Sequence, residues 1–418
     1  MPVQDRRAAI LELMKSIYFV KPMGQNSYRH SFLTALAVLE FWETDATRQL
    51  TRKLAKQAKL ETVRLGQGDR QTFAALLMDT IKANLFEPAF FRLPFPPSGT
   101  VSDCISASDK DNFADRYWAT FLTAADRTIE TWLSVHPVPK VKLMIPSVQF
   151  GSVRMVASGD HATWRGLQAR FPGLQRLDPN TGTFHTEASG VTFNVLPETW
   201  LVSENAGTSE AARIQASREM SILVALIFAN SSKPGRFLKS AADPVHRVVQ
   251  VSEDKGRETS FSFTHMPEIL PPILGTLSFD AATEPSVAAW YAKRAAATPA
   301  NAARASTAAA FYHHGIIADD LEKFVHLFVV LDALFGVPFG VKKQLKIGTQ
   351  KVFPGDRSWV DRALLLYDLR NDIVHGSISA LADWSEDDNY FATYGSSATE
   401  DVITLATKAL VRFFDLPH

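Results

Sequence analysis

The chain has 418 residues, 46% of them hydrophobic and 21% charged, and its formal net charge at pH 7 is zero. This length allows two or three domains, each with a core of its own. Zero net charge excludes a global basic field that attracts nucleic acid, so any contact with RNA has to come from a local patch. The single cysteine, Cys104, excludes an intramolecular disulfide and a zinc site of several thiolates, and it indicates a reducing compartment.

No stretch of the chain predicts a membrane span or a secretory signal. The most apolar run, residues 220–229, is far shorter than the roughly 20 residues that a membrane-spanning helix needs. Residues 1–20 mix charges into their apolar positions, whereas a signal peptide has a continuous apolar region. We therefore expect a cytoplasmic protein without a membrane partner.

Residues 1–136 are predicted to form an N-terminal helical region. Apolar residues recur every three or four positions there, which is the spacing of amphipathic helices. The stretches with this spacing are residues 7–20, 28–59, 69–85 and 112–135. The Pro-containing segment 136–139 ends this region.

Residues 137–285 are predicted to form an α+β domain. Short runs alternate apolar and polar residues, as at 191–195 and 261–264, and turn-forming residues such as 178–182 bound these runs. This pattern is typical of strands. One helical stretch, residues 209–229, interrupts them.

Residues 286–418 are predicted to be helical throughout. Pro299 suits a first helical turn, and Gly336 and Gly376 suit positions just after a helix, where φ is positive. Four amphipathic helices with modest loops predict an antiparallel four-helix bundle. We expect these helices at residues 299–314, 319–335, 358–375 and 398–414. The fold class is thus mainly α, with an α+β middle region and a C-terminal bundle.

The predicted helix 358–375 is apolar on two sides. One stripe, formed by Leu366, Leu369 and Ile373, is expected to face its own bundle. The other side also carries apolar side chains, which suggests that a second surface is covered. These side chains are Leu364, Tyr367 and Val374.

Arg370, Asn371 and His375 interrupt this second apolar side. Asn371 and His375 are four positions apart and share a face, whereas Arg370 lies about 140° away from His375 around the helix. Burial of such groups without partners is costly. One economical solution is a two-fold homodimer in which this side meets its own copy; two Arg370 and two His375 side chains would then line one cleft.

Asp332 is the carboxylate in the otherwise apolar part of the helix 319–335. A carboxylate in such a helix requires a partner, and Arg370 is the candidate. The pair would hold the guanidinium in place.

These residues also carry a resemblance to a known family. The sequence LYDLRNDIVHGS at residues 366–377, which follows a helix ending in LDALFG at 331–336, resembles the Apea-like branch of the HEPN superfamily. That branch has an acidic residue in the first segment and an Arg-Asn-x-x-x-His-Gly run in the second. The resemblance covers residues 300–418. It departs from the family pattern at position 332, which is Asp where Glu is expected, and the shorter side chain reaches less far.

The resemblance implies metal-independent RNA cleavage at a dimer interface, without a cofactor. His375 would take the proton from a ribose 2′-OH or give one to the leaving 5′-oxygen. Arg370 would bind the scissile phosphate, and Asn371 would orient the histidine or contact the phosphate. Asp332 and Tyr367 would support them. The expected products carry a 2′,3′-cyclic phosphate, and the resemblance suggests a role in phage defence or a toxin-like system.

The lysines at 342, 343 and 346 are expected in the loop before this helix, where they could steer an RNA backbone. No metal site is expected, since the histidines at 313, 314 and 326 lack Asp, Glu or Cys partners at ligand spacing. The ligand or trigger of the N-terminal region stays unidentified.

Three alternatives remain open at this point. Arg370 and His375 are also compatible with a salt-bridged arginine and a histidine at a helix end, with no catalytic role. The bundle would then be a non-catalytic HEPN dimerisation or binding module that recognises a protein or nucleotide partner. A third reading is a nuclease that is silent until its middle domain binds a trigger.

Overall fold

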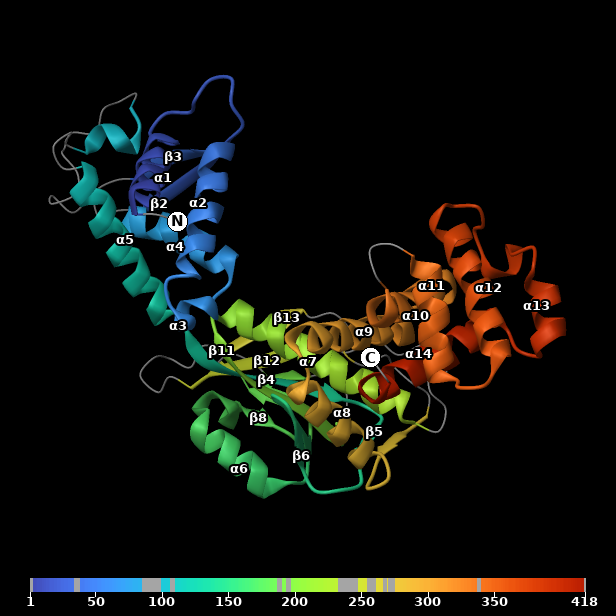
Figure 1. Ribbon diagram of the computed structural model, residues 1–418. Helices are drawn as coiled ribbons and strands as arrows, with labels where there is room; N and C mark the ends of the chain where they lie inside the picture. Colours follow the sequence, from blue (N-terminus) through green and yellow to red (C-terminus); the bar gives the residue numbers. More distant parts are fainter. Residues whose placement is uncertain are drawn as a thin grey trace. The chain divides into compact units, whose positions relative to one another are not determined.

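The computed structural model describes residues 3–33, 38–84, 99–105, 110–185, 190–192, 197–231, 247–253, 261–265, 269, 275–336 and 340–416 (Figure 1). The chain divides into two compact units. The N-terminal unit comprises Met1–Trp132 and Ala206–Arg213, and the C-terminal unit comprises Leu133–Asn205 and Ile214–His418. The protein is mainly helical, and its middle region contains a β-sheet.

The N-terminal unit combines helices with a three-stranded antiparallel sheet of order β1-β3-β2. Its elements are α1 (Val3–Lys15), β1 (Ile17–Tyr18), β2 (Ser27–Leu33), β3 (Val38–Thr44), α2 (Asp45–Ala58), α3 (Val63–Gly66), α4 (Arg70–Asn84), η1 (Val101–Cys104) and α5 (Lys110–Arg127). Leu13, Leu54, Leu77 and Phe121 are buried in a core shared by the four long helices.

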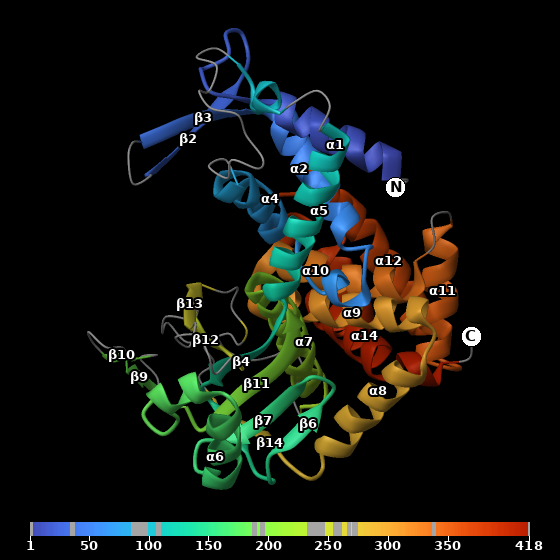
Figure 2. The same cartoon turned by 90° about the vertical axis from the view of Figure 1, so that its left-hand side faces the viewer.

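The prediction of a helix over residues 28–59 is wrong for its first half. Residues 27–33 and 38–44 form β2 and β3, which pair antiparallel along their whole length and lie side by side in Figure 2. Thr44 then starts α2, because its hydroxyl and that of Thr47 cap each other's backbone N–H groups. The apolar spacing in 28–44 fits both structures, and only pairing with another strand separates them.

Cys104 is buried in the core of this unit. Burial raises the pKa of its thiol to about 11. The thiol is therefore almost fully protonated at neutral pH.

A six-stranded sheet of order β13-β12-β4-β11-β7-β6 forms the middle of the chain. Its strands are β4 (Glu130–Val138), β6 (Val148–Phe150), β7 (Val153–Ala157), β11 (Thr199–Gly207), β12 (Arg247–Ser252) and β13 (Phe261–His265). Smaller sheets have the orders β10-β9-β8 and β14-β5, formed by β5 (Val141–Leu143), β8 (Leu177–Asp178), β9 (Thr183–His185), β10 (Gly190–Thr192) and β14 (Leu277–Phe279). The expected strand-containing middle region is thus confirmed.

The two faces of the six-stranded sheet have separate cores, because successive side chains of a strand point to opposite faces. Leu201 belongs to the core with α7 (Ser209–Ala229), whereas its neighbour Trp200 packs against Trp164 of α6 (His161–Arg170). The core on the α7 face continues into the C-terminal helices. Sheet and C-terminal helices therefore belong to one unit.

The C-terminal helices are α8 (Glu284–Ala296), α9 (Pro299–Ile317), α10 (Asp320–Phe335), α11 (Val341–Val352), α12 (Arg357–Val374), α13 (Asp387–Tyr394) and α14 (Ala398–Arg412). The four expected helices correspond to α9, α10, α12 and α14. Helix α10 is central, because it contacts α9, α11, α12 and α14. Its sequence is almost wholly apolar after the first turn, which suits a helix covered on several sides.

Two expectations about this part of the chain are wrong. The segment that carries the predicted RNA-binding lysines is helix α11, not a loop; it buries Leu345, Thr349 and Val352 and exposes the lysines. Gly336 has a φ of −62°, so positive φ does not explain this glycine. A Cβ atom there would lie 2.3 Å from the Asp332 carbonyl oxygen, so the close approach of the backbone requires glycine.

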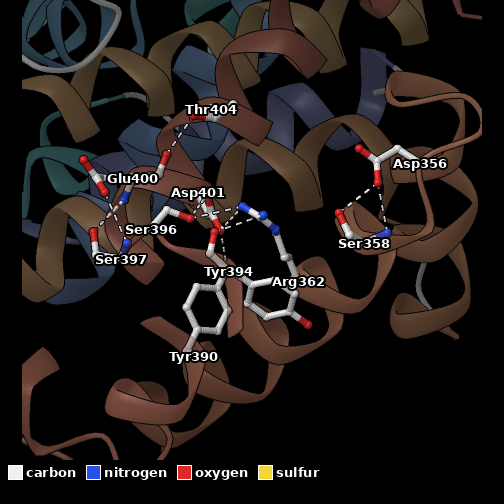
Figure 3. Close-up of polar contacts among 10 residues, drawn as sticks. All are labelled: Asp356, Ser358, Arg362, Tyr390, Tyr394, Ser396, Ser397, Glu400, Asp401 and Thr404. Atoms are coloured by element: carbon white, nitrogen blue, oxygen red, sulfur yellow. Dashed lines mark hydrogen bonds and ion pairs between the residues drawn. The ribbon is translucent and has the colours of Figure 1, made fainter. Parts of the chain in front are cut away.

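Helices α12, α13 and α14 are joined by a buried polar network around Asp401 (Figure 3). The Asp401 carboxylate accepts hydrogen bonds from Arg362 Nη1 at 2.8 Å, Tyr390 Oη at 2.7 Å and Ser396 Oγ at 2.9 Å. The Arg362 guanidinium also lies over the ring of Tyr394, 4.6 Å from its centroid. The side chains of Asp401 and Arg362 are only 4% and 16% exposed.

We predict that Asp401→Ala strongly destabilises the C-terminal unit. The change leaves the buried Arg362 guanidinium without its carboxylate, and loss of one partner of a buried pair costs about 3–5 kcal/mol. Asp415→Ala is the control, because Asp415 pairs with Lys293 at the surface, where an ion pair contributes about 1 kcal/mol or less. Denaturant-induced unfolding of the two variants measures the difference. Equal losses of stability would contradict a structural role for this network.

Candidate functional site

Helix α12 carries the predicted catalytic residues, and local signals define both of its ends. Asp356 caps the first turn by accepting hydrogen bonds from the Ser358 backbone N–H and hydroxyl. The hydrogen bond from the Ser358 side chain lowers the pKa of the Asp356 carboxyl. At the other end Gly376, with a φ of +73°, donates its N–H to Ile373, and Ser377 donates to Asp372. This pattern is a Schellman motif, and it ends the helix at His375.

The apolar stripe of α12 faces the interior, as expected. Leu366 and Leu369 are fully buried, and Ile373 packs against the same core. The second side is only partly covered: Tyr367 is half-buried, and Val374 is 53% exposed.

Arg370 is held between two neighbours. Its Nη1 donates a hydrogen bond of 3.1 Å to Asn371 Oδ1, and its Nη2 lies 3.6 Å from Asp332 Oδ2 on α10. The predicted pairing of Asp332 with Arg370 is therefore present, but at an ion-pair distance longer than a hydrogen bond. The Arg370 Nε atom is buried and has no hydrogen-bond partner among the described residues.

Asp332 is partly shielded from solvent, with 28% of its side chain exposed. Burial raises the pKa of this carboxyl above its usual range, and the charge of Arg370 offsets only part of the effect. The surroundings of the Asp332 carboxyl thus disfavour its charged form.

His375 is exposed at the C-terminal end of α12. Its backbone N–H bonds to the Asn371 carbonyl at 2.9 Å, and no described residue makes a hydrogen bond to its imidazole ring. The Asn371 side chain contacts Arg370 instead of this ring. The structure therefore brings Arg370, Asn371 and Asp332 together and leaves the imidazole open to solvent.

The predicted RNA-binding lysines differ in their surroundings. Lys342 Nζ donates to both oxygens of Asp368, at 2.9 and 3.0 Å, and lies 5.6 Å from the centre of the Tyr367 ring. Tyr367 in turn packs against Phe328. Lys343 and Lys346 are exposed on α11 and form no ion pair with a described residue. Two of the three lysines are thus available to an anion.

The histidines at 313, 314 and 326 have different surroundings. His313 is buried, its Nε2 lies 2.6 Å from the Ile269 carbonyl oxygen, and burial lowers its pKa to about 4. The His314 and His326 rings lie 5.5 Å apart. Within the described ranges, no group of three or more His, Cys, Asp or Glu side chains is arranged to hold a metal ion. None of the described helices is long and apolar enough to cross a membrane.

No family model matches this chain, and no curated protein or solved structure shows a significant match to it.

We predict that Asp332→Asn raises the stability of the protein at neutral pH. Folding raises the pKa of this carboxyl, so the charged form destabilises the folded state. This cost disappears as the pH falls below the pKa of an aspartate in the unfolded chain, about 3.9. The variant should therefore be more stable than the wild type at pH 7, and the difference should shrink towards pH 4.

Denaturant-induced unfolding at several pH values measures this effect. Asp361→Asn is the control, because Asp361 is exposed on the same site-bearing helix. Lower stability of Asp332→Asn at pH 7 would show that the contact with Arg370 outweighs the cost of burial.

Proposed function

We propose that the C-terminal unit is a metal-independent endoribonuclease of HEPN type, and that it acts as a homodimer through Arg370 and His375. The observation that carries this proposal is an arginine with unused hydrogen-bond donors on the same helix end as a solvent-exposed histidine. The resemblance of residues 366–377 to the Apea-like branch supports the assignment. The helices α9, α10, α12 and α14 would form the HEPN-like bundle.

The position of Arg370 suits phosphate binding. Asn371 and Asp332 restrain the Arg370 guanidinium from two directions. Their contacts leave several of its N–H donors unused. A phosphate can take two parallel N–H donors from one guanidinium. Such a contact would neutralise the negative charge that builds up on the phosphate oxygens in the transition state.

The exposure of His375 suits proton transfer. In the proposed reaction an imidazole removes the proton of the ribose 2′-OH, the 2′-oxygen attacks the adjacent phosphorus, and the bond to the 5′-oxygen breaks. The leaving 5′-oxygen takes a proton from a protonated imidazole, and the other product ends in a 2′,3′-cyclic phosphate. Two copies of His375 in one cleft would supply the base and the acid.

A two-fold dimer would bring these copies together. The exposed Val374 lies next to His375, so contact between two such helix ends would bury apolar surface beside the site. Lys343 and Lys346 would add positive charge for the RNA backbone. On the strength of the resemblance, we place the protein in phage defence or a toxin-like system, and we keep the cytoplasmic location expected from the sequence.

We predict that the purified protein cleaves RNA in EDTA and that Arg370→Ala and His375→Ala each lower the rate by about 10²-fold or more, the usual contribution of a proton-transfer group or of a donor that stabilises the transition state. Arg357→Ala and His161→Ala are matched controls, because both residues are exposed and lie outside the site. Gel analysis gives the rates, and mass spectrometry identifies the cyclic phosphate. Equal rates for site and control variants would contradict the proposal.

We also predict that the protein sediments with about twice its chain mass of 46.2 kDa, and that Val374→Asp shifts it towards the monomer. A charge at the centre of an apolar contact is desolvated without a partner, which weakens association. Analytical ultracentrifugation measures the mass. A wild-type monomer at all concentrations would exclude the dimeric site.

The alternative function is a non-catalytic HEPN binding module. One observation favours it. The side chains of Asn371 and Lys342 are already hydrogen-bonded to Arg370 and Asp368, so fewer groups are free to bind a substrate. A dimer that lacks RNA cleavage in the assay above would favour this alternative over a constitutively active nuclease.

A further inference from the structure

A groove of about 850 Å³ lies between α2 and α4 in the N-terminal unit. Three of the side chains that line it are arginines: Arg48 and Arg52 on α2 and Arg70 at the start of α4. We call it the arginine groove. Since the chain as a whole has zero net charge, such a concentration of positive charge is a local feature.

The helices present these arginines along the groove. Arg48 and Arg52 lie one turn apart, so both project from the same face of α2. On α4 the residues Ala74 and Ala75 follow one turn after Arg70 and also line the groove. Their small side chains leave room for a ligand between the two helices.

The guanidinium groups of the groove keep their positive charge available. All three arginines are exposed, and none forms an ion pair with a described residue. Arg48 lies over the ring of Tyr28, 3.2 Å from its centroid, which orients the guanidinium without neutralising it. The carboxylates of Glu43 and Asp79 also line the groove, but each has an interaction of its own.

We infer that the arginine groove binds single-stranded nucleic acid through its phosphate backbone. Three unpaired cations close together repel each other, and a row of phosphates relieves this repulsion. The groove is open, its arginines lie on α2 and at the start of α4, and Tyr28, exposed at 38%, contacts Arg48 beside it. An open basic groove with aromatic side chains is how proteins hold single strands without a base-shaped pocket. This inference does not depend on the proposed nuclease site.

The test is fluorescence anisotropy with a labelled single-stranded oligonucleotide, as RNA and as DNA of the same sequence. The full chain carries Arg370→Ala in every case, so that cleavage does not interfere and binding is measured apart from catalysis. In this background we compare Arg52→Ala/Arg70→Ala with Lys53→Ala/Lys56→Ala. The lysines are exposed on α2 but line a different groove, between α1 and α2, so the control removes the same charge.

We expect the arginine pair variant to bind at least about tenfold more weakly than its parent and the lysine pair variant to bind like its parent. Each lost phosphate contact lowers the salt dependence of binding to a single strand by about 0.7 in the logarithmic slope, so the two arginines should account for about 1.4. Binding of RNA alone, or of RNA and DNA alike, supports the inference. Equal loss in both variants, or no binding of either oligonucleotide by the parent, would overturn it.

Discussion

The proposed site depends most on the hydrogen bonds that the buried Asp401 carboxylate accepts. This carboxylate binds Arg362 of α12, Tyr390 of α13 and Ser396 just before α14, so one side chain fixes three elements. Arg362 and Leu366 lie one turn apart on the same face of α12. The contact between Arg362 and Asp401 therefore holds α12 in one rotation about its own axis. With that rotation fixed, Leu366 enters the core and Arg370 reaches α10, where Asp332 is its neighbour.

The Arg370–Asp332 pair is held less closely than the Arg362–Asp401 pair of the same unit. Arg362 and Asp401 form a close pair with further hydrogen bonds around it. Arg370 and Asp332 stand 3.6 Å apart, against 2.8 Å for Arg362 and Asp401, and the buried Nε atoms of both arginines lack a hydrogen-bond partner among the described residues. A buried N–H group without an acceptor has a free-energy cost, and a ligand that accepts its hydrogen bond removes this cost. Departures of this kind are concentrated at functional sites.

The sequence predicted those features that have local signals. The C-terminal end of α12 follows from Gly376, and the start of α9 follows from Pro299, because each acts on neighbouring backbone groups. The pairing of Asp332 with Arg370 was predictable, since a carboxylate in an apolar helix requires a cation.

Features formed by distant residues were not predictable in the same way. The strands β2 and β3 resemble a helix in their apolar spacing until they pair. Helix α11 is rich in lysine and follows Gly336, so its polar face suggested a loop. Arg362 and Asp401 are 39 positions apart, and nothing in either neighbourhood distinguishes them from surface charges. The arginine groove likewise depends on two helices that meet only in the folded chain.

The state of Cys104 has a practical consequence. A thiol with a pKa of about 11 offers almost no thiolate at neutral pH, and the thiolate is the form that reacts with maleimides. Cys104 is also buried in the core, so we expect a maleimide to react with it only slowly in the folded chain. A cysteine introduced on the exposed side of α2 and another on α11 would carry a pair of spin labels or fluorophores with little background. Their separation could then be followed in real time while an oligonucleotide is added.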